Sequence, residues 1–148
     1  MAKLIDLIVG ARPNFVKIAA IICAIKKVQI AEVQLNYRLI HTGRHYDSNM
    51  SQEFFTQLNI PEPDINLQVG SGTQSEQTGA IMISYEKLLL NSPSHLCLVV
   101  GDVTSTMACA ITAQKNGVRV AHVEAGIRSG DWSMPEEINR IVTDSITD

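Results

Sequence analysis

The sequence lacks several features that would each define a class of protein. It has no run of 18 apolar residues, so we expect no membrane span. The long apolar stretch of a secretory signal is absent as well, and we therefore expect a cytoplasmic protein. The 148 residues carry 12 basic and 15 acidic side chains and a net charge of -3. A nucleic-acid partner would gain no electrostatic support from this balance, so we expect none.

Cysteine and histidine are too few and too scattered for a disulfide framework or a metal centre. The three cysteines (Cys23, Cys97 and Cys109) are odd in number and lie in apolar surroundings. We expect three small buried side chains in a reducing compartment. Among the four histidines, His41 and His45 are four residues apart, but a strand end and a loop separate them. We expect neither a metal site nor another cofactor.

The chain instead alternates two kinds of apolar segment. Short, nearly continuous runs are typical of buried parallel strands, and apolar residues spaced by three and four are typical of helices. The predicted strands are 4–9, 34–42, 64–67, 95–100 and 118–123, and the predicted helices are 15–25, 50–58, 73–91, 104–115 and a last one from 133 onward. This alternation predicts an α/β fold with a Rossmann-like, doubly wound parallel sheet.

Two helix starts and the end of the sequence carry further local signals. Thr73 and Glu76 have the spacing of a capping box, and Ser133 and Glu136 have the same spacing. Residues 144–148 stop in helix-like sequence without a closing cap, where a domain of this kind would return to another strand. We therefore expect residues 1–148 to be one domain that is cut short before its last elements.

Ligands of doubly wound sheets bind outside the carboxyl ends of the strands, and cationic residues lie at the first such end. Arg12 ends the first strand and Lys17 lies about one turn into the following helix. The loop has only one glycine, so it is not a dinucleotide-binding fingerprint. The two cations either face an anionic ligand or are solvated surface charges. His45, in the loop after the second strand, is the histidine best placed to touch a ligand.

Three carboxylates follow the later strands. Asp102 comes directly after the fourth strand, Glu124 ends the fifth, and Glu136 lies in the first turn of the last helix. Asp102 and Glu136 have an alternative role as helix caps. Carboxylates gathered in a partly dry cleft repel one another, which raises the pKa of at least one and suits it to proton transfer. The residues alone therefore predict acid/base chemistry on an anionic substrate.

Four segments, in order, resemble the motifs of the non-hydrolysing UDP-N-acetylglucosamine (UDP-GlcNAc) 2-epimerases. They are 10–17 (GARPNFVK), 41–47 (HTGRHYD), 100–106 (VGDVTST) and 122–140, which opens with HVEAGIRS and closes with MPEEINR. The resemblance covers nearly the whole chain. It implies the N-terminal Rossmann-like half of a two-domain fold of the glycosyltransferase-B (GT-B) type. The active site would lie between the two domains, and the C-terminal UDP-binding domain is absent from this chain.

The resemblance also implies a reaction and a set of residues. The reaction is reversible inversion at C2 of UDP-GlcNAc to give UDP-ManNAc, by elimination of UDP to a 2-acetamidoglucal and re-addition. By motif, the catalytic residues are Asp102, Glu124 and Glu136, and the substrate-binding residues are Arg12, Lys17, His45 and Arg140. Many of the residues that bind UDP, and a catalytic histidine, would lie in the second domain. We therefore expect this chain alone to be inactive. Because members of the family are commonly dimers, the resemblance also implies that the whole protein is a homodimer.

Two departures from the family pattern leave the substrate open. Arg44 replaces a glutamine that, in some bacterial members, helps to bind a second, activating UDP-GlcNAc. Asn14 and Phe15 replace a Glu-Ala pair, and an Asn there occurs in relatives that act on a UDP-diacetamido uronic acid. The alternatives are a C2 epimerase of that sugar, a hydrolysing UDP-GlcNAc 2-epimerase and a glycosyltransferase. For the chain alone, a non-catalytic sugar-nucleotide-binding domain is a further alternative.

Overall fold

The computed structural model describes residues 2–43 and 52–148. Within these ranges the strands are β1 (Lys3–Val9), β2 (Leu35–His41), β3 (Ile65–Asn66), β4 (Leu96–Val100) and β5 (Arg119–Val123). The helices are α1 (Arg12–Ile30), α2 (Gln52–Leu58), α3 (Gln74–Asn91), α4 (Thr104–Lys115) and α5 (Pro135–Ile146). None of the helices in the described ranges is long and apolar enough to cross a membrane.

The strands form one sheet in the order β3-β2-β1-β4-β5, and every neighbouring pair is parallel. The chain starts at the centre, moves outward through β2 to β3, and then crosses to β4 and β5. The order therefore reverses between β1 and β4, which is the switch point at which such sheets bind ligands. The predicted Rossmann-like, doubly wound sheet is confirmed.

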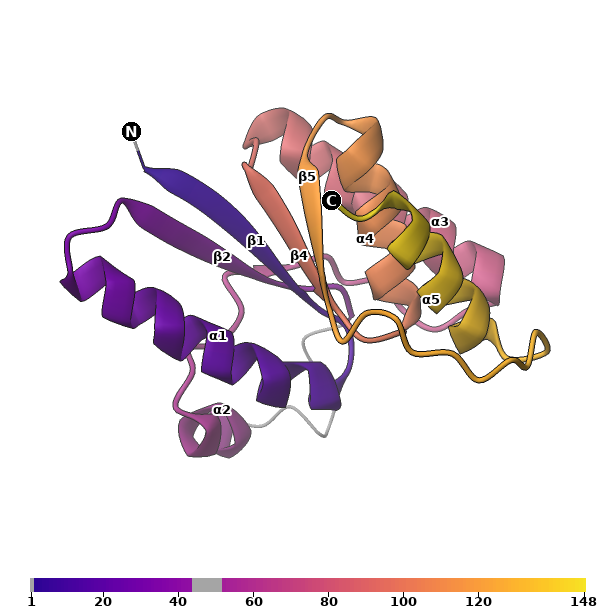
Figure 1. The fold of residues 1–148 in the computed structure, drawn as a ribbon, viewed down its shortest axis with the longest axis horizontal. Coiled ribbons are helices and arrows are strands. Elements are labelled where there is room, and N and C mark those ends of the chain that lie inside the picture. Colours follow the sequence, from indigo (N-terminus) through magenta and orange to yellow (C-terminus); the bar gives the residue numbers. More distant parts are fainter. Residues whose placement is uncertain (1, 44–51) are drawn as a thin grey trace.

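Helices cover both faces of this sheet, with α1 and α2 on one face and α3, α4 and α5 on the other (Figure 1). Side chains alternate across a strand, so one strand contributes to both layers. Leu7 and Val9 of β1 pack with Phe15 and Ile18 of α1, whereas Ile8 packs beneath α3 and α4. The two hydrophobic cores together hold the sheet edge at which the site residues lie.

The cysteines do not all lie in these cores. Cys97 and Cys109 are buried as predicted, and burial raises the pKa of the Cys97 thiol to about 12, so it is unreactive near neutral pH. Cys23 is exposed, and the prediction that it is buried was wrong. Its neighbour Ile22 faces the core, and one residue along a helix turns a side chain by about 100°.

A charged cluster lies inside the sheet, and sequence analysis did not predict it. Asp6, in the middle of β1, is fully buried. Its carboxylate accepts hydrogen bonds from Arg38 (Nε at 2.8 Å and Nη2 at 3.0 Å) and from the hydroxyl of Tyr85 at 2.8 Å. These bonds join β1, β2 and α3, and they satisfy a charge that would otherwise be costly to bury.

The helix starts partly follow the sequence signals. In α3 the amide of Glu76 donates to Thr73 Oγ1 at 3.2 Å and the amide of Thr73 donates to Glu76 Oε1 at 3.4 Å, so that capping box is confirmed. The capping box expected at Ser133 is not formed. Met134 is the N-cap residue of α5, and the hydroxyl of Ser133 donates to Asp131. The helix begins one residue later than the capping-box pattern requires.

Candidate active site

Two of the predicted carboxylates lie at neighbouring strand ends. Val100 of β4 pairs with Val123 of β5, so Asp102 and Glu124 follow adjacent strands at the same edge of the sheet. Glu124 has φ 68°, in the left-handed region that favours glycine. A non-glycine residue there costs about 1–2 kcal/mol. Such strain tends to be kept at functional positions, and it supports a role for Glu124.

Asp102 is held by the last helix. Its carboxylate accepts a hydrogen bond from Arg140 Nη1 at 2.5 Å, and its carbonyl oxygen accepts one from Asn139 Nδ2 at 2.8 Å. The helix-cap alternative for Asp102 does not apply, because Val103 is the N-cap residue of α4 and its side chain makes no cap bond. The Asp102 carboxylate therefore faces a guanidinium, which holds it in one orientation.

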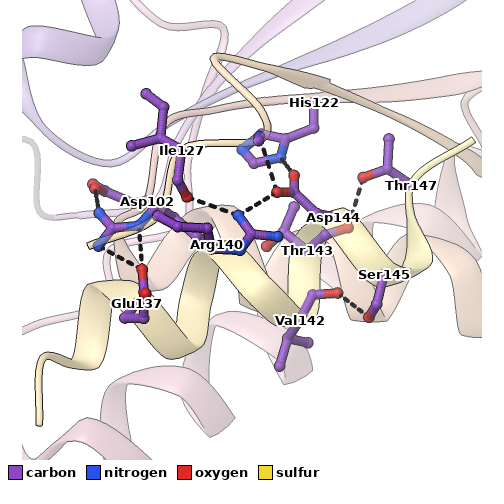
Figure 2. Close-up of polar contacts among 12 residues, drawn as sticks. Asp102, His122, Ile127, Glu137, Arg140, Val142, Thr143, Asp144, Ser145 and Thr147 are labelled. Atoms are coloured by element: carbon purple, nitrogen blue, oxygen red, sulfur yellow. Dashed lines mark hydrogen bonds and ion pairs between the residues drawn. The ribbon is translucent and has the colours of Figure 1, made fainter. Parts of the chain in front are cut away.

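Arg140 is itself shared between two carboxylates. Besides Asp102, its Nε donates to Glu137 Oε1 at 3.1 Å (Figure 2). Burial works to lower the pKa of Arg140, but its bonds to Glu137 and Asp102 outweigh this and raise the pKa above its ordinary value. The guanidinium is thus a fixed positive charge behind Asp102, and it orients that carboxylate.

Glu124 has a cation of its own. The Lys17 ammonium group, on the second turn of α1, forms an ion pair with Glu124 Oε2. Both side chains are partly exposed, at 38% and 40%, so the pair opens to solvent and to ligands. Each of the two strand-end carboxylates therefore has a cation partner. The sequence instead predicted that the carboxylates would repel one another.

Arg12 and Glu136 are not members of these pairs. Arg12 is exposed, and its guanidinium stacks 4.6 Å from the ring centroid of Phe54. Glu136 is exposed in the first turn of α5 and forms no ion pair with any residue that the structure describes. His45 lies outside the described residues. Of the three predicted carboxylates, Asp102 and Glu124 thus follow neighbouring strands, and Glu136 lies in the first turn of α5.

Two carboxylates that the sequence analysis did not single out hold the segment after Glu124. Glu137 is 1% exposed and accepts the amides of Ser129 at 3.0 Å and Gly130 at 2.6 Å. The Ser129 amide is the main cause that lowers the pKa of Glu137, with the Gly130 amide and Arg140 adding to it against the effect of burial. The carboxylate is therefore ionised and clamps the loop to α5.

Asp144 is the second of these carboxylates. It accepts the amide of Gly126 at 3.0 Å and Arg128 Nη1 at 2.7 Å, and it lies 2.6 Å from His122 Nδ1 (Figure 2). Residues 137, 140 and 144 have the 3 and 4 spacing of one helix face. Charged residues on one face of a helix that covers a sheet are the signal in the sequence that could have indicated these contacts.

A pocket with a volume of about 630 Å³ opens between the ends of β1 and β2 and the helices α3 and α4. Its lining includes Gly10, Thr42 and Ser105, and also Val103, which follows Asp102 in sequence. A Cβ atom on Gly10 would lie 2.3 Å from Ser105 Oγ, so only glycine fits there. The single glycine of the first loop therefore serves close packing against α4. In the described ranges no three His, Cys, Asp or Glu side chains gather to hold a metal ion.

The fold and this edge define a class of protein: a Rossmann-like half of a GT-B type fold with paired carboxylates and cations where ligands bind. The chain belongs to the UDP-N-acetylglucosamine 2-epimerase family, whose family model matches residues 26–148. The recognition made from the four motifs is therefore confirmed.

Two relatives show how close the similarity is. The UDP-N-acetylglucosamine 2-epimerase of Methanocaldococcus jannaschii is 46% identical over 143 residues, which are 97% of this chain and 38% of that protein. The UDP-2,3-diacetamido-2,3-dideoxy-D-glucuronate 2-epimerase of Pseudomonas aeruginosa is 45% identical, over 95% of this chain and 39% of that protein. The chain thus spans less than two fifths of the length of these relatives.

Solved structures of UDP-GlcNAc 2-epimerases have the same fold as this chain. The crystal structure of the M. jannaschii UDP-GlcNAc 2-epimerase in complex with UDP-GlcNAc and UDP superposes with a TM-score of 0.88 and 44% identity, covering 97% of this chain and 38% of that one. The Neisseria meningitidis UDP-GlcNAc 2-epimerase bound to UDP-GlcNAc superposes with a TM-score of 0.84 and 26% identity, covering 98% of this chain and 39% of that one.

Proposed function

We propose that the whole protein is a non-hydrolysing UDP-GlcNAc 2-epimerase, an isomerase that interconverts UDP-GlcNAc and UDP-ManNAc. The observation that carries the proposal is the pairing of Glu124 with Lys17, beside Asp102 with Arg140, at the ligand-binding edge of a chain 46% identical to such an enzyme. Epimerisation at C2 needs a base for a weakly acidic proton and support for a departing diphosphate. This edge offers both kinds of group.

Proton abstraction needs a carboxylate that the substrate can reach. Glu124 is the candidate, since its Oε2 pairs with the Lys17 ammonium group and its side chain is 40% exposed. As the C2 proton moves to a carboxylate, the electron pair of the C–H bond forms the C1–C2 double bond. The bond between C1 and the diphosphate oxygen breaks as this double bond forms, and UDP leaves with the electron pair of that bond. The product of this half-reaction is 2-acetamidoglucal.

The departing diphosphate gains negative charge, which a nearby cation stabilises. When Glu124 takes up a proton, the Lys17 ammonium loses its counter-charge and is available to that diphosphate. Return of UDP to C1, with a proton delivered to the opposite face of C2 by a second acid, completes the inversion. Asp102 and Glu136 are the remaining candidates for that acid. Arg12 and His45 are proposed to bind substrate, and Arg140 to act through Asp102.

The rest of the proposal concerns what lies beyond this chain. We infer that residues 1–148 are the N-terminal domain of a GT-B type protein and that a second domain binds uridine and diphosphate, with a further catalytic histidine. We also infer that the whole protein is cytoplasmic and forms a homodimer. Light scattering would measure the mass of that dimer.

Proton NMR in D2O tests the reaction directly. The whole protein is incubated with UDP-GlcNAc, and the expected result is growth of the UDP-ManNAc anomeric signal with deuterium at C2. Deuterium at C2 shows proton abstraction, and an intact nucleotide sugar shows that UDP is returned. Accumulation of free ManNAc and UDP would replace this proposal by the hydrolysing reaction.

A UDP-diacetamido uronic acid is the second candidate substrate, because the P. aeruginosa relative is nearly as similar as the M. jannaschii one. Asn14, a departure noted in the sequence, is 4% exposed, and its Oδ1 accepts the amides of Gly10 at 3.1 Å and Ala11 at 3.3 Å. Its carbonyl oxygen is thus occupied by the first loop, and the residue does not by itself favour one sugar. The same NMR experiment with the uronic acid nucleotide decides between the two.

A further inference from the structure

His122 stands between the two strand ends that carry the site. It belongs to β5, two residues before Glu124, and its side chain is 1% exposed. One ring nitrogen, Nδ1, lies 2.6 Å from Asp144 Oδ1, and the other, Nε2, lies 2.7 Å from the carbonyl oxygen of Gly101. Figure 2 shows the ring facing Asp144 at the end of the polar network of α5.

Both partners of the ring are hydrogen-bond acceptors. A backbone carbonyl oxygen cannot donate. Burial works to raise the pKa of Asp144, but the hydrogen bonds from Arg128 and the Gly126 amide are the largest causes that lower it, and the pKa lies below its usual value, so Asp144 is ionised. Two acceptors at hydrogen-bond distance require a proton on each ring nitrogen. A ring with a proton on each nitrogen, an imidazolium, fits both contacts.

The charges around the ring agree with this state. The ion pairs formed by α1, the ends of β4 and β5, the following loop and α5 contain four carboxylates and three permanent cations. They are Asp102, Glu124, Glu137 and Asp144 against Lys17, Arg128 and Arg140. A charged His122 makes four cations against four carboxylates. The His122 side chain is 1% exposed and that of Asp144 is 16% exposed, so a charged ring at this position needs that carboxylate as its counter-charge.

We propose that His122 is a positioning residue that, as an imidazolium, fixes the Gly101–Asp102 turn relative to the loop that follows Glu124. One contact holds the carbonyl of Gly101, directly before Asp102. The other holds Asp144, which in turn holds the amide of Gly126. One buried ring thus sets the distance between the two carboxylates. The catalytic consequence rests on the proposed epimerase function, whereas the charge state of the ring does not.

The charge state is tested on the unaltered protein by nitrogen NMR with 15N-labelled histidine. The two ring nitrogens of an imidazolium have nearly equal shifts, whereas a neutral ring has one bare nitrogen with a strongly shifted signal. We expect the imidazolium pattern for His122 at pH 7, assigned by its loss in a His122→Gln variant. A bare nitrogen on His122 would overturn the proposal, whether or not the protein proves to be an epimerase.

The positioning role is tested by two substitutions that each keep one donor. His122→Asn places an amide nitrogen near Nδ1 and keeps the contact to Asp144, and His122→Gln places one near Nε2 and keeps the contact to Gly101. We expect kcat for UDP-GlcNAc epimerisation to fall by about 10- to 100-fold with His122→Asn, with a smaller change in KM. The Gln variant should retain more activity, because Asp102 stays in register.

The matched control is His95→Asn, since the exposed His95 accepts the Leu4 amide at the opposite end of the sheet. That variant should keep the kcat of the unaltered protein. An Asn variant of His122 that is as active as the Gln variant would overturn the positioning role. If either His122 variant melts early, the nitrogen spectrum of the unaltered protein still decides the proposal. If the unaltered protein epimerises neither nucleotide sugar, the proposed function fails and that spectrum remains the test.

Discussion

Glu124 is the single residue on which the proposed chemistry depends most. Glu124→Gln keeps the size of the side chain and one acceptor oxygen but removes the group that accepts a proton. We expect kcat to fall by about 10²- to 10⁴-fold, the usual contribution of a general base. The rate of UDP-ManNAc formation measures this. Glu62→Gln, at an exposed position between two prolines, should leave kcat unchanged. A Glu124→Gln variant with unaltered kcat would remove this residue from the mechanism.

Asp6 shows a different kind of dependence, on stability. Asp6→Ala leaves Arg38 and the Tyr85 hydroxyl without their buried partner, and we expect a loss of about 3–5 kcal/mol in the free energy of unfolding. Arg119 pairs with Asp148 at 3.9 Å, with side-chain exposures of 76% and 37%. Arg119→Ala should therefore cost less than about 1 kcal/mol. Urea unfolding followed by circular dichroism compares the two, and similar losses would contradict the buried-pair account.

At the scale of the elements, the helix starts of α3 and α5 offer a matched comparison. Thr73→Ala removes the side-chain oxygen that caps α3, and we expect a loss of about 1 kcal/mol in the free energy of unfolding. Ser133→Ala removes a hydroxyl that bonds Asp131 outside α5, and the loss should stay within about 0.5 kcal/mol. Thermal unfolding of both variants measures the difference. A Ser133→Ala loss as large as that of Thr73→Ala would show that Ser133 caps α5 after all.

The clamp between α5 and the loop after β5 should weaken in acid. Glu137 has a lower pKa in the folded protein than its ordinary 4.5, so the unfolded chain binds its proton more readily. Its contribution to stability is complete above the ordinary value and is lost as the pH falls through the lowered folded value. Glu137→Gln should therefore flatten the fall of the unfolding free energy between about pH 5 and 3. Urea unfolding over that range measures this, and an unchanged slope would contradict it.

At the scale of the whole molecule, the described domain has two cores and a sheet of five paired strands, and the proposal makes it one wall of a cleft between two domains. We expect the 148-residue chain to fold, to bind UDP far more weakly than the whole protein, and to form no UDP-ManNAc. Calorimetric titration with UDP and the NMR assay measure the two quantities. Turnover by the chain alone at the rate of the whole protein would contradict a two-domain site.

Much of this architecture could be predicted from the sequence, because buried parallel strands are apolar on both faces and stand out as short runs. The same reasoning predicted that Asp102 and Glu124 lie at one edge, since the carboxyl ends of parallel strands meet there. Their partners could not be predicted. Arg140 reaches Asp102 across 38 residues of sequence. Whether Glu136 or its neighbour Glu137 faces inward depends on the residue at which α5 begins. The capping-box spacing of Ser133 predicted a start that is one residue too early.

The left-handed backbone of Glu124 has a consequence for how this protein responds to selection. Glycine at that position would relieve the strain and make the fold more stable, so a search for heat-resistant variants alone would tend to find it. The same change would delete the proposed base. The backbone at this position thus favours glycine, whereas the proposed chemistry needs a carboxylate, so the proposal sets resistance to heat against catalytic rate at this one residue.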